Sequence, residues 1–117
     1  MAVIAAQVFD TGQERVAVWP NLTDGDTGAP VDFSRFARVV VSGTGVWDDE
    51  TLAMEANNVL STSASYGAMV DVHGEDAELT DDGFINLGKW NNHFLRPNIA
   101  AGSSATTAVT VVAVGTR

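Results

Sequence analysis

Two histidines and a run of acidic residues are the side chains of this sequence best suited to metal binding. His73 and His93 lie twenty residues apart and share no spacing used by a metal site. The stretch DVHGEDAELTDD carries six carboxylates of the kind that Ca²⁺ takes as ligands: Asp71, Glu75, Asp76, Glu78, Asp81 and Asp82. It lacks the spacing of a calcium loop, and such turns are usually just solvated. The stretch DGDTG (24–28) resembles the start of a calcium loop but lacks its third ligand and its distal glutamate. We therefore predict neither a metal site nor a cofactor.

Nucleophilic catalysis has no residues to support it. The chain has no cysteine, no Gly-x-Ser-x-Gly elbow, and no serine that the sequence ties to a histidine and an acid. The Gly-Thr-Gly at 43–45 is too short for a phosphate-binding loop and runs into Val46 and Trp47, which do not start a helix. Paired carboxylates for glycoside cleavage stay open from sequence alone, but a chain of 117 residues seldom encloses a catalytic cleft. We predict that the protein is not an enzyme.

The charge balance narrows the class of partner. The chain carries 15 acidic residues against 6 Lys and Arg, a formal charge of -9. Binding to nucleic acid requires clustered Lys and Arg to replace condensed counterions, so we expect no nucleic-acid partner. The apolar start of the chain, residues 1–9, is too short to span a bilayer and lacks the basic start of a signal peptide. We expect no membrane partner and synthesis in the cytoplasm.

Apolar stretches recur with a spacing typical of an all-β protein. Short apolar segments separated by Gly, Asn, Asp and Ser follow one another every 10 to 15 residues, and a helical period is hard to find. Strands are expected at 2–9, 14–22, 35–44, 51–57, 68–74, 83–88, 93–100 and 106–115. The length suits one domain over 1–117. We predict a single antiparallel β-sandwich (jelly-roll or Ig-like) of about seven or eight strands, with a small barrel as the alternative.

Several local features refine this prediction. The alternation in 68–74 places Val70 and Val72 inward. Residues 22–30 hold turn residues and form a compact loop, whereas 56–69 is least determined and reads as a Ser-rich loop or one helical turn. Pro97 removes a ladder donor, which predicts an edge or bulged strand. We expect Trp19 in the core, while Trp47 and Trp90 either fill the core or anchor an interface.

The two ends of the chain are apolar on both strand faces. In 105–115, Val109 and Val111 lie on one side and Val112 and Val114 on the other, so a strand with one wet face would leave valines uncovered. Residues 1–9 have the same character. They are either the first strand of the sandwich or an arm that adds a strand to a neighbour. We expect these doubly apolar segments to be covered by other polypeptides.

The order of motifs resembles that of small tailed-bacteriophage capsid decoration (cement) proteins. The segments that carry the resemblance are WPNLTDGDTGAPVDFSRFARVVVSGTGVW, LAMEANN and GFINLGKWNNHFLRPNIAAGSSATTAVTVVAVG. The matching residues are Trp19, Asn21, Leu22, Asp26, Thr27, Gly28, Pro30, Phe33, Phe94, Leu95, Arg96, Pro97 and Gly102. The chain departs from the pattern at 55–58, where Glu-Ala-Asn-Asn replaces a Glu-Gly-Ser-Asn-Asp-Gly-like turn.

The resemblance implies a β-sandwich on the outside of an icosahedral head. Such proteins commonly form trimers at three-fold and quasi-three-fold positions and staple neighbouring major capsid proteins. The expected partners are therefore the major capsid protein and the chain itself, and the expected interface residues are Val3, Ile4, Phe9, Trp47, Trp90, Arg96, Val112 and Val114. One alternative is a tail- or fibre-associated module that binds host carbohydrate, which needs exposed Trp or Tyr pairs. A small β-sandwich accessory domain with an enzymatic or calcium-dependent role is the other.

Overall fold

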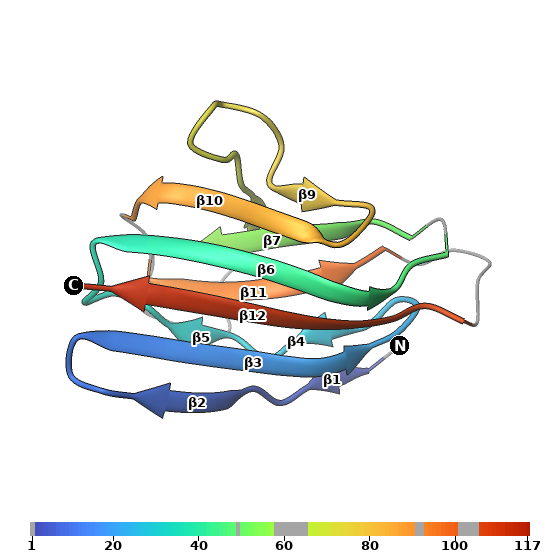
Figure 1. Ribbon diagram of the computed structural model, residues 1–117, viewed down its shortest axis with the longest axis horizontal. Coiled ribbons are helices and arrows are strands. Elements are labelled where there is room, and N and C mark those ends of the chain that lie inside the picture. Colours follow the sequence, from blue (N-terminus) through green and yellow to red (C-terminus); the bar gives the residue numbers. More distant parts are fainter. Residues whose placement is uncertain (1, 49, 58–65, 91–92, 101–105) are drawn as a thin grey trace.

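The computed structural model describes residues 2–48, 50–57, 66–90, 93–100 and 106–117, with the Lys89 side chain left out (Figure 1). These residues form twelve strands and no helix, so no helix in this part of the chain could cross a membrane. The strands are β1 (Val3–Ile4), β2 (Gln7–Asp10), β3 (Glu14–Leu22), β4 (Thr27–Gly28), β5 (Val31–Asp32), β6 (Arg38–Val46), β7 (Leu52–Asn57), β8 (Gly67–Ala68), β9 (Glu78–Leu79), β10 (Gly83–Lys89), β11 (Phe94–Ile99) and β12 (Ala108–Thr116).

The strands form the two layers of a sandwich. One sheet has five strands in the order β10-β6-β12-β3-β2, and it faces the viewer in Figure 1. The other has the order β1-β4-β11-β7-β8, with β5 beside β11 and β9 beside β7. The predicted all-β sandwich is confirmed, and the sheets do not close into a barrel. Pairing is antiparallel except between β1 and β4, which run parallel.

The core lies between the two sheets. The inward-facing residues of β12, Val109, Val111 and Ala113, are fully buried, as the alternation of the sequence requires. Trp19 of β3 is also fully buried, and its Nε1 donates a hydrogen bond of 2.8 Å to the Ala29 carbonyl. The prediction that Trp19 fills the core is confirmed. Its indole N–H has the partner that burial of a polar atom demands.

Pro97 does not lie on an edge strand, contrary to expectation. β11 pairs with β7 on one side and with β4 and β5 on the other. A Cβ added to Gly28 of β4 would lie only 2.5 Å from Pro97 Cδ, so the ring side of Pro97 faces Gly28. The missing N–H costs little here, because the partner strand on that side is broken into two short pieces, β4 and β5.

Residues 68–74 do not form the strand that their alternation predicts. The extended part ends at Ala68, and Val70 and Val72 point outward instead of inward, with 54% and 52% of their surface exposed. Asp71 causes the turn, because its Oδ1 accepts hydrogen bonds from the amides of His73 (2.8 Å) and Glu75 (3.0 Å). Such local side-chain bonds offer the backbone an alternative to a sheet ladder.

The N-terminal segment belongs to the chain's own sandwich. β1 pairs with β4 in one sheet and β2 pairs with β3 in the other, so residues 2–10 cross between the two layers. The Ala2 amide donates a hydrogen bond of 3.0 Å to Asp26. Of the two alternatives for this segment, the structure therefore has the first strand and not a free arm.

Candidate functional site

The outer face of the five-stranded sheet carries two rows of mostly apolar side chains. Residues directly opposite one another on antiparallel strands point to the same face. The register therefore places Phe9, Val16, Val114 and Val40 in one row. It places Val18, Val112, Ser42 and Phe84 in the next. We call the seven apolar members the apolar stripe: Phe9, Val16, Val18, Val40, Phe84, Val112 and Val114.

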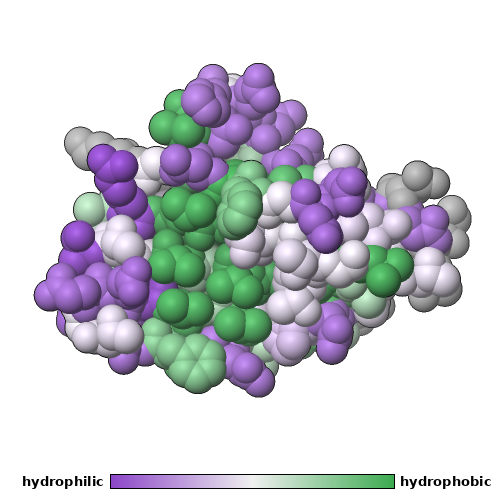
Figure 2. All heavy atoms as spheres, viewed as in Figure 1, coloured by the Kyte–Doolittle hydropathy of each residue, from purple (hydrophilic) through white to green (hydrophobic). Residues whose placement is uncertain are grey.

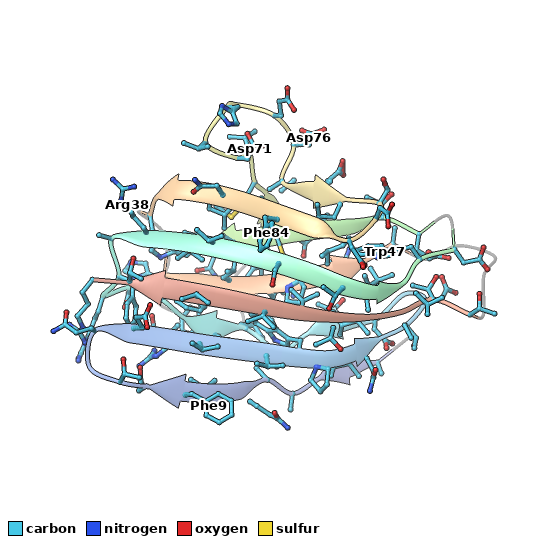
Figure 3. All side chains as sticks on the ribbon, viewed as in Figure 1. Phe9, Arg38, Trp47, Asp71, Asp76 and Phe84 are labelled. Carbon is cyan, nitrogen blue, oxygen red and sulfur yellow. The ribbon has the colours of Figure 1, made fainter. Side chains whose placement is uncertain are left out.

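The stripe is open to solvent. Phe84 is 79% exposed, Phe9 56% and Val40 40%, while the other four valines are half-buried by their neighbours within the sheet. Figure 2 shows the stripe as a continuous hydrophobic patch that crosses the sheet face. Phe9 on β2 and Phe84 on β10 mark its two ends in Figure 3. The described residues offer no second layer over this side of β12, which the sequence suggested would need a cover.

Charged residues are almost absent from this face. Toward the start of β12 the rows continue with Thr44, Thr110, Ala108 and Val46, which are neutral. One row carries charge, at the opposite end of the face, where Glu14, Arg38 and Lys89 align with Thr116. Of the acidic residues that the structure describes, only Glu14 has a register position on this face. Depletion of charge around an apolar centre is the compositional mark of a protein–protein interface.

Three of the expected interface residues lie on the stripe: Phe9, Val112 and Val114. Val3 and Ile4 lie elsewhere, on β1 in the other sheet. Val3 is exposed there, and Ile4 packs against the core.

Neither of the two uncertain tryptophans belongs to the stripe. Trp90 is only 6% exposed and packs edge-on against Phe33, with ring centroids 6.3 Å apart. It is a core residue and not a surface anchor, because its ring belongs to the buried cluster between the sheets. Trp47 is half-buried against the core, and its Nε1 donates a hydrogen bond of 2.8 Å to Asp82 Oδ1.

Arg96 is engaged within its own chain. It lies opposite Glu55 in the β11–β7 register, and its Nε donates a hydrogen bond of 2.8 Å to Glu55 Oε1. Its guanidinium also lies 4.0 Å from the centre of the Tyr66 ring. The sequence offered Arg96 as a partner for an acid across an interface. The structure gives it an acid and an aromatic ring within the chain.

The acidic residues stabilise turns. Asp71 holds the turn described above, and Asp82 Oδ1 accepts hydrogen bonds from the Gly45 amide (3.0 Å) and Trp47 Nε1. Among the residues that the structure describes, no three His, Asp or Glu side chains converge as a metal-ligand set. His73 is exposed in the turn and His93 is half-buried beside β11.

Asp26 is the buried carboxylate with the best-defined surroundings. Its Oδ2 accepts hydrogen bonds from the amide (2.9 Å) and hydroxyl (2.8 Å) of Thr23, and its Oδ1 accepts one from the Ala2 amide. Burial raises the pKa of Asp26, but these hydrogen bonds to the ionised form outweigh it and leave the pKa below its ordinary value. The residue ties the N-terminus to the loop before β4 and takes no part in the stripe.

Sequence reasoning missed four stripe residues: Val16, Val18, Val40 and Phe84. The signal for three of them was present. RVAVW and RVVVS are apolar at both odd and even positions, as the last strand is. The criterion used for 105–115, apolar residues on both faces of a strand, also predicts Val16, Val18 and Val40 as interface residues. Phe84 carried no such signal, because its place in the stripe depends on the pairing of β10 with β6.

Comparisons with known proteins bear on the fold. No protein-family model matches the chain, and no curated protein sequence matches it. Among solved structures, the SPBc2 prophage-derived protein YomS superposes with a TM-score of 0.66 at 10% identity, over 93% of this chain and 99% of that chain. The two proteins share a fold.

Two further similarities are lower. PliG of Aeromonas hydrophila, a periplasmic inhibitor of g-type lysozyme, gives a TM-score of 0.47 at 11% identity, over 99% of this chain and 96% of that chain. Protein NMB1881 from Neisseria meningitidis gives 0.45 at 9% identity, over 96% and 83%. No functional conclusion rests on either.

Proposed function

We propose that this protein is a virion structural protein that decorates the outside of an icosahedral phage head and bridges neighbouring major capsid proteins. The observation that carries the proposal is the apolar stripe on a face almost free of charge. In this proposal the stripe is the surface that contacts the capsid, and three copies assemble at three-fold and quasi-three-fold positions. The protein is made in the host cytoplasm and ends up on the outer capsid surface.

The stripe fits a protein partner better than water. The stripe takes apolar residues from all five strands, with Ser42 between Val112 and Phe84 in the second row, and forms one patch, whereas scattered exposed apolar residues are normal on any protein. Phe9 and Phe84 are large and exposed at the two ends of the stripe, and aromatic residues are enriched at protein–protein interfaces. The described acidic residues other than Glu14 lie elsewhere, and they contribute to the net charge that keeps the free protein soluble.

An apolar contact surface is suited to holding neighbouring capsid subunits together. A head filled with DNA is under outward load, and a contact that bridges two capsid subunits opposes their separation. Each contact can be modest, because a trimer that engages several subunits gains from effective concentration. The fold shared with a prophage-derived protein and the motif resemblance to decoration proteins support a phage origin.

The carbohydrate-binding alternative has no comparable support. The expected glycan platform needs two exposed Trp or Tyr rings on one face. Among the described residues, Trp19 and Trp90 are buried and Trp47 is tied to Asp82. Tyr66 lies against the Arg96 guanidinium. No observation favours this second function.

The test is reconstitution on heads that lack the protein. The variant Phe9→Ser/Phe84→Ser removes the two aromatic residues of the stripe from exposed positions. We expect its occupancy on heads to fall at least about tenfold, while the free energy of unfolding changes by less than about 1 kcal/mol.

Val70→Ser/Val72→Ser is the control, because it removes two exposed apolar side chains from a turn outside the stripe. It should bind heads like the unchanged protein. If both variants lost occupancy equally, or if neither lost any, the stripe would not be the surface that binds the capsid. Absence of the unchanged protein from purified virions would remove the proposal itself.

A further inference from the structure

The positive charges of this acidic chain gather at one end of the sandwich. Because β3 and β6 run antiparallel to β12 and β10, the starts of the first pair lie beside the ends of the second. We call this end the cationic end. Five of the six Lys and Arg residues belong to it by chain position: Arg15, Arg35, Arg38, Lys89 and Arg117.

The opposite charge dominates the rest of the chain. The cationic end also holds Asp10, Glu14 and Asp32, so five cations against three acids give it a net charge of +2. The remainder then has one cation, Arg96, against twelve acids, a net charge of -11, which accounts for the total of -9. The charge is therefore strongly polarised.

Three guanidinium groups at the cationic end form no ion pair among the described residues. Arg15 is neutralised by Asp10 (2.9 Å), and the hydrogen bond that it donates lowers the pKa of that carboxyl, to which the Arg117 charge also contributes. Arg35, Arg38 and Arg117 make no ion pair with any described residue.

One of the three is also held in place. The Arg117 guanidinium lies 5.3 Å from the centre of the Phe36 ring, the same distance as that of Arg15, and the Arg117 amide donates to the Gln13 carbonyl. An aromatic ring that holds two guanidiniums fixes part of this charge before any partner arrives.

The far end of the same strands presents exposed carboxylates. Asp48 follows β6 and Asp81 and Asp82 precede β10, and the Gly45 amide and the Trp47 indole fix Asp82 there. Glu78 of β9 is exposed beside the start of β10, since Leu79 packs against Gly83. We call these four residues the acidic end. Arg38 and Trp47 mark the two ends in Figure 3.

We propose that copies of this chain associate head to tail, with the cationic end of one copy against the acidic end of the next. This deepens the self-association that is part of the proposed function, and it does not depend on binding to heads. Both halves of the contact are present on every copy and lie at opposite ends, so the contact is heterologous. It closes into a ring if the rotation between successive copies brings the last copy against the first, and otherwise continues as an open filament. The stripe lies on the sheet face between the two ends and stays free for the capsid.

A charge-swap series tests the proposal by sedimentation velocity on the full chain without heads. The first variant, Arg35→Glu/Arg38→Glu, reverses the cationic end, and the second, Glu78→Lys/Asp81→Lys, reverses the acidic end. All four residues are exposed, and circular dichroism checks that each variant folds. Glu75→Lys/Asp76→Lys, in the turn after β8, is the control for the second variant, because it changes the net charge by the same amount and in the same direction.

The unchanged protein is expected to sediment as a closed ring of about three times 12.3 kDa at low salt and to dissociate as salt is raised. Each single-end variant should associate at least about tenfold more weakly, and the four-residue combination should restore association, because it exchanges the two ends. The control should associate like the unchanged protein.

Three results would overturn the proposal: a monomer at all concentrations, association that ignores the single-end variants, or a combined variant that stays dissociated. In the last case the cationic end serves an acidic surface of another protein. A monomer that still binds heads through the stripe would refute the head-to-tail contact and leave the proposed function standing.

Discussion

Individual polar residues hold the loops of this sandwich, and Asp26 is the clearest example. Its pKa lies below the ordinary value of about 3.9. The folded chain therefore keeps this carboxylate ionised at pH values where the unfolded chain takes up a proton. Its stabilising contribution is complete above the ordinary pKa and is lost as the pH falls through the lower folded value. Stability should decline on acidification below about pH 4.

We expect Asp26→Asn to lower the free energy of unfolding at pH 7 by about 1–3 kcal/mol, because an amide cannot replace a carboxylate that accepts three hydrogen bonds. Urea denaturation at pH 7 and pH 3 measures this, and the difference between the variant and the unchanged protein should shrink at pH 3. Asp81→Asn, at an exposed carboxylate, should change stability by less than about 0.5 kcal/mol. A gap that stays constant with pH would rule out the ionised form as the cause.

Gly28 lies where the surrounding side chains leave no room for a Cβ atom. A Cβ there would lie 2.5 Å from Pro97 Cδ and 2.6 Å from Trp19 Cδ1, well inside van der Waals contact. Gly28→Ala should therefore destabilise the fold by about 1–3 kcal/mol or more. Gly67→Ala is the control, because no atom lies within 4 Å of the added carbon. Thermal denaturation of both variants compares their melting temperatures. Equal melting temperatures would show that β4 can move away from β11.

At the scale of elements, the turn between β8 and β9 protects an edge of the five-stranded sheet. The Val72 amide donates a hydrogen bond of 2.8 Å to the Asn86 carbonyl of β10, so the turn covers part of an edge that would otherwise be open to strand pairing. Asp71 holds the turn together. We expect Asp71→Ala to cost about 0.5–2 kcal/mol and to speed hydrogen exchange of the Val72 amide. Asp76→Ala, in the same turn but without a side-chain role there, should leave exchange unchanged, and faster exchange in both would mean that Asp71 has no special part.

The long strands were predictable and the short ones were not. Residues 14–22, 51–57 and 83–88 are apolar stretches bounded by turn residues, and β3, β7 and β10 lie there. The strands β4, β5 and β9 have two residues each. Their positions depend on pairing with neighbouring strands more than on any local sequence pattern. The alternation at 68–74 wrongly predicted a strand, because the Asp71 carboxylate accepts hydrogen bonds from nearby amides and stabilises a turn there. The sequence marked two strands of the stripe, β2 and β12, but the other three strands enter it through register, which depends on the order of strands in the sheet.

At the scale of the whole molecule, the proposed role predicts a mechanical effect on the virion. Filled heads stripped of this protein should release DNA at a lower temperature than decorated heads, because bridging contacts oppose the outward load only while they are occupied. Adding back the purified chain should restore the release temperature, and an intercalating dye that reports freed DNA measures it. Phe9→Ser/Phe84→Ser should fail to restore it, whereas Val70→Ser/Val72→Ser should succeed. Heads that hold their DNA equally well with and without the protein would show that it binds the shell without reinforcing it. The stripe would then be an attachment surface, and the function of the protein would lie on the opposite, exposed sheet.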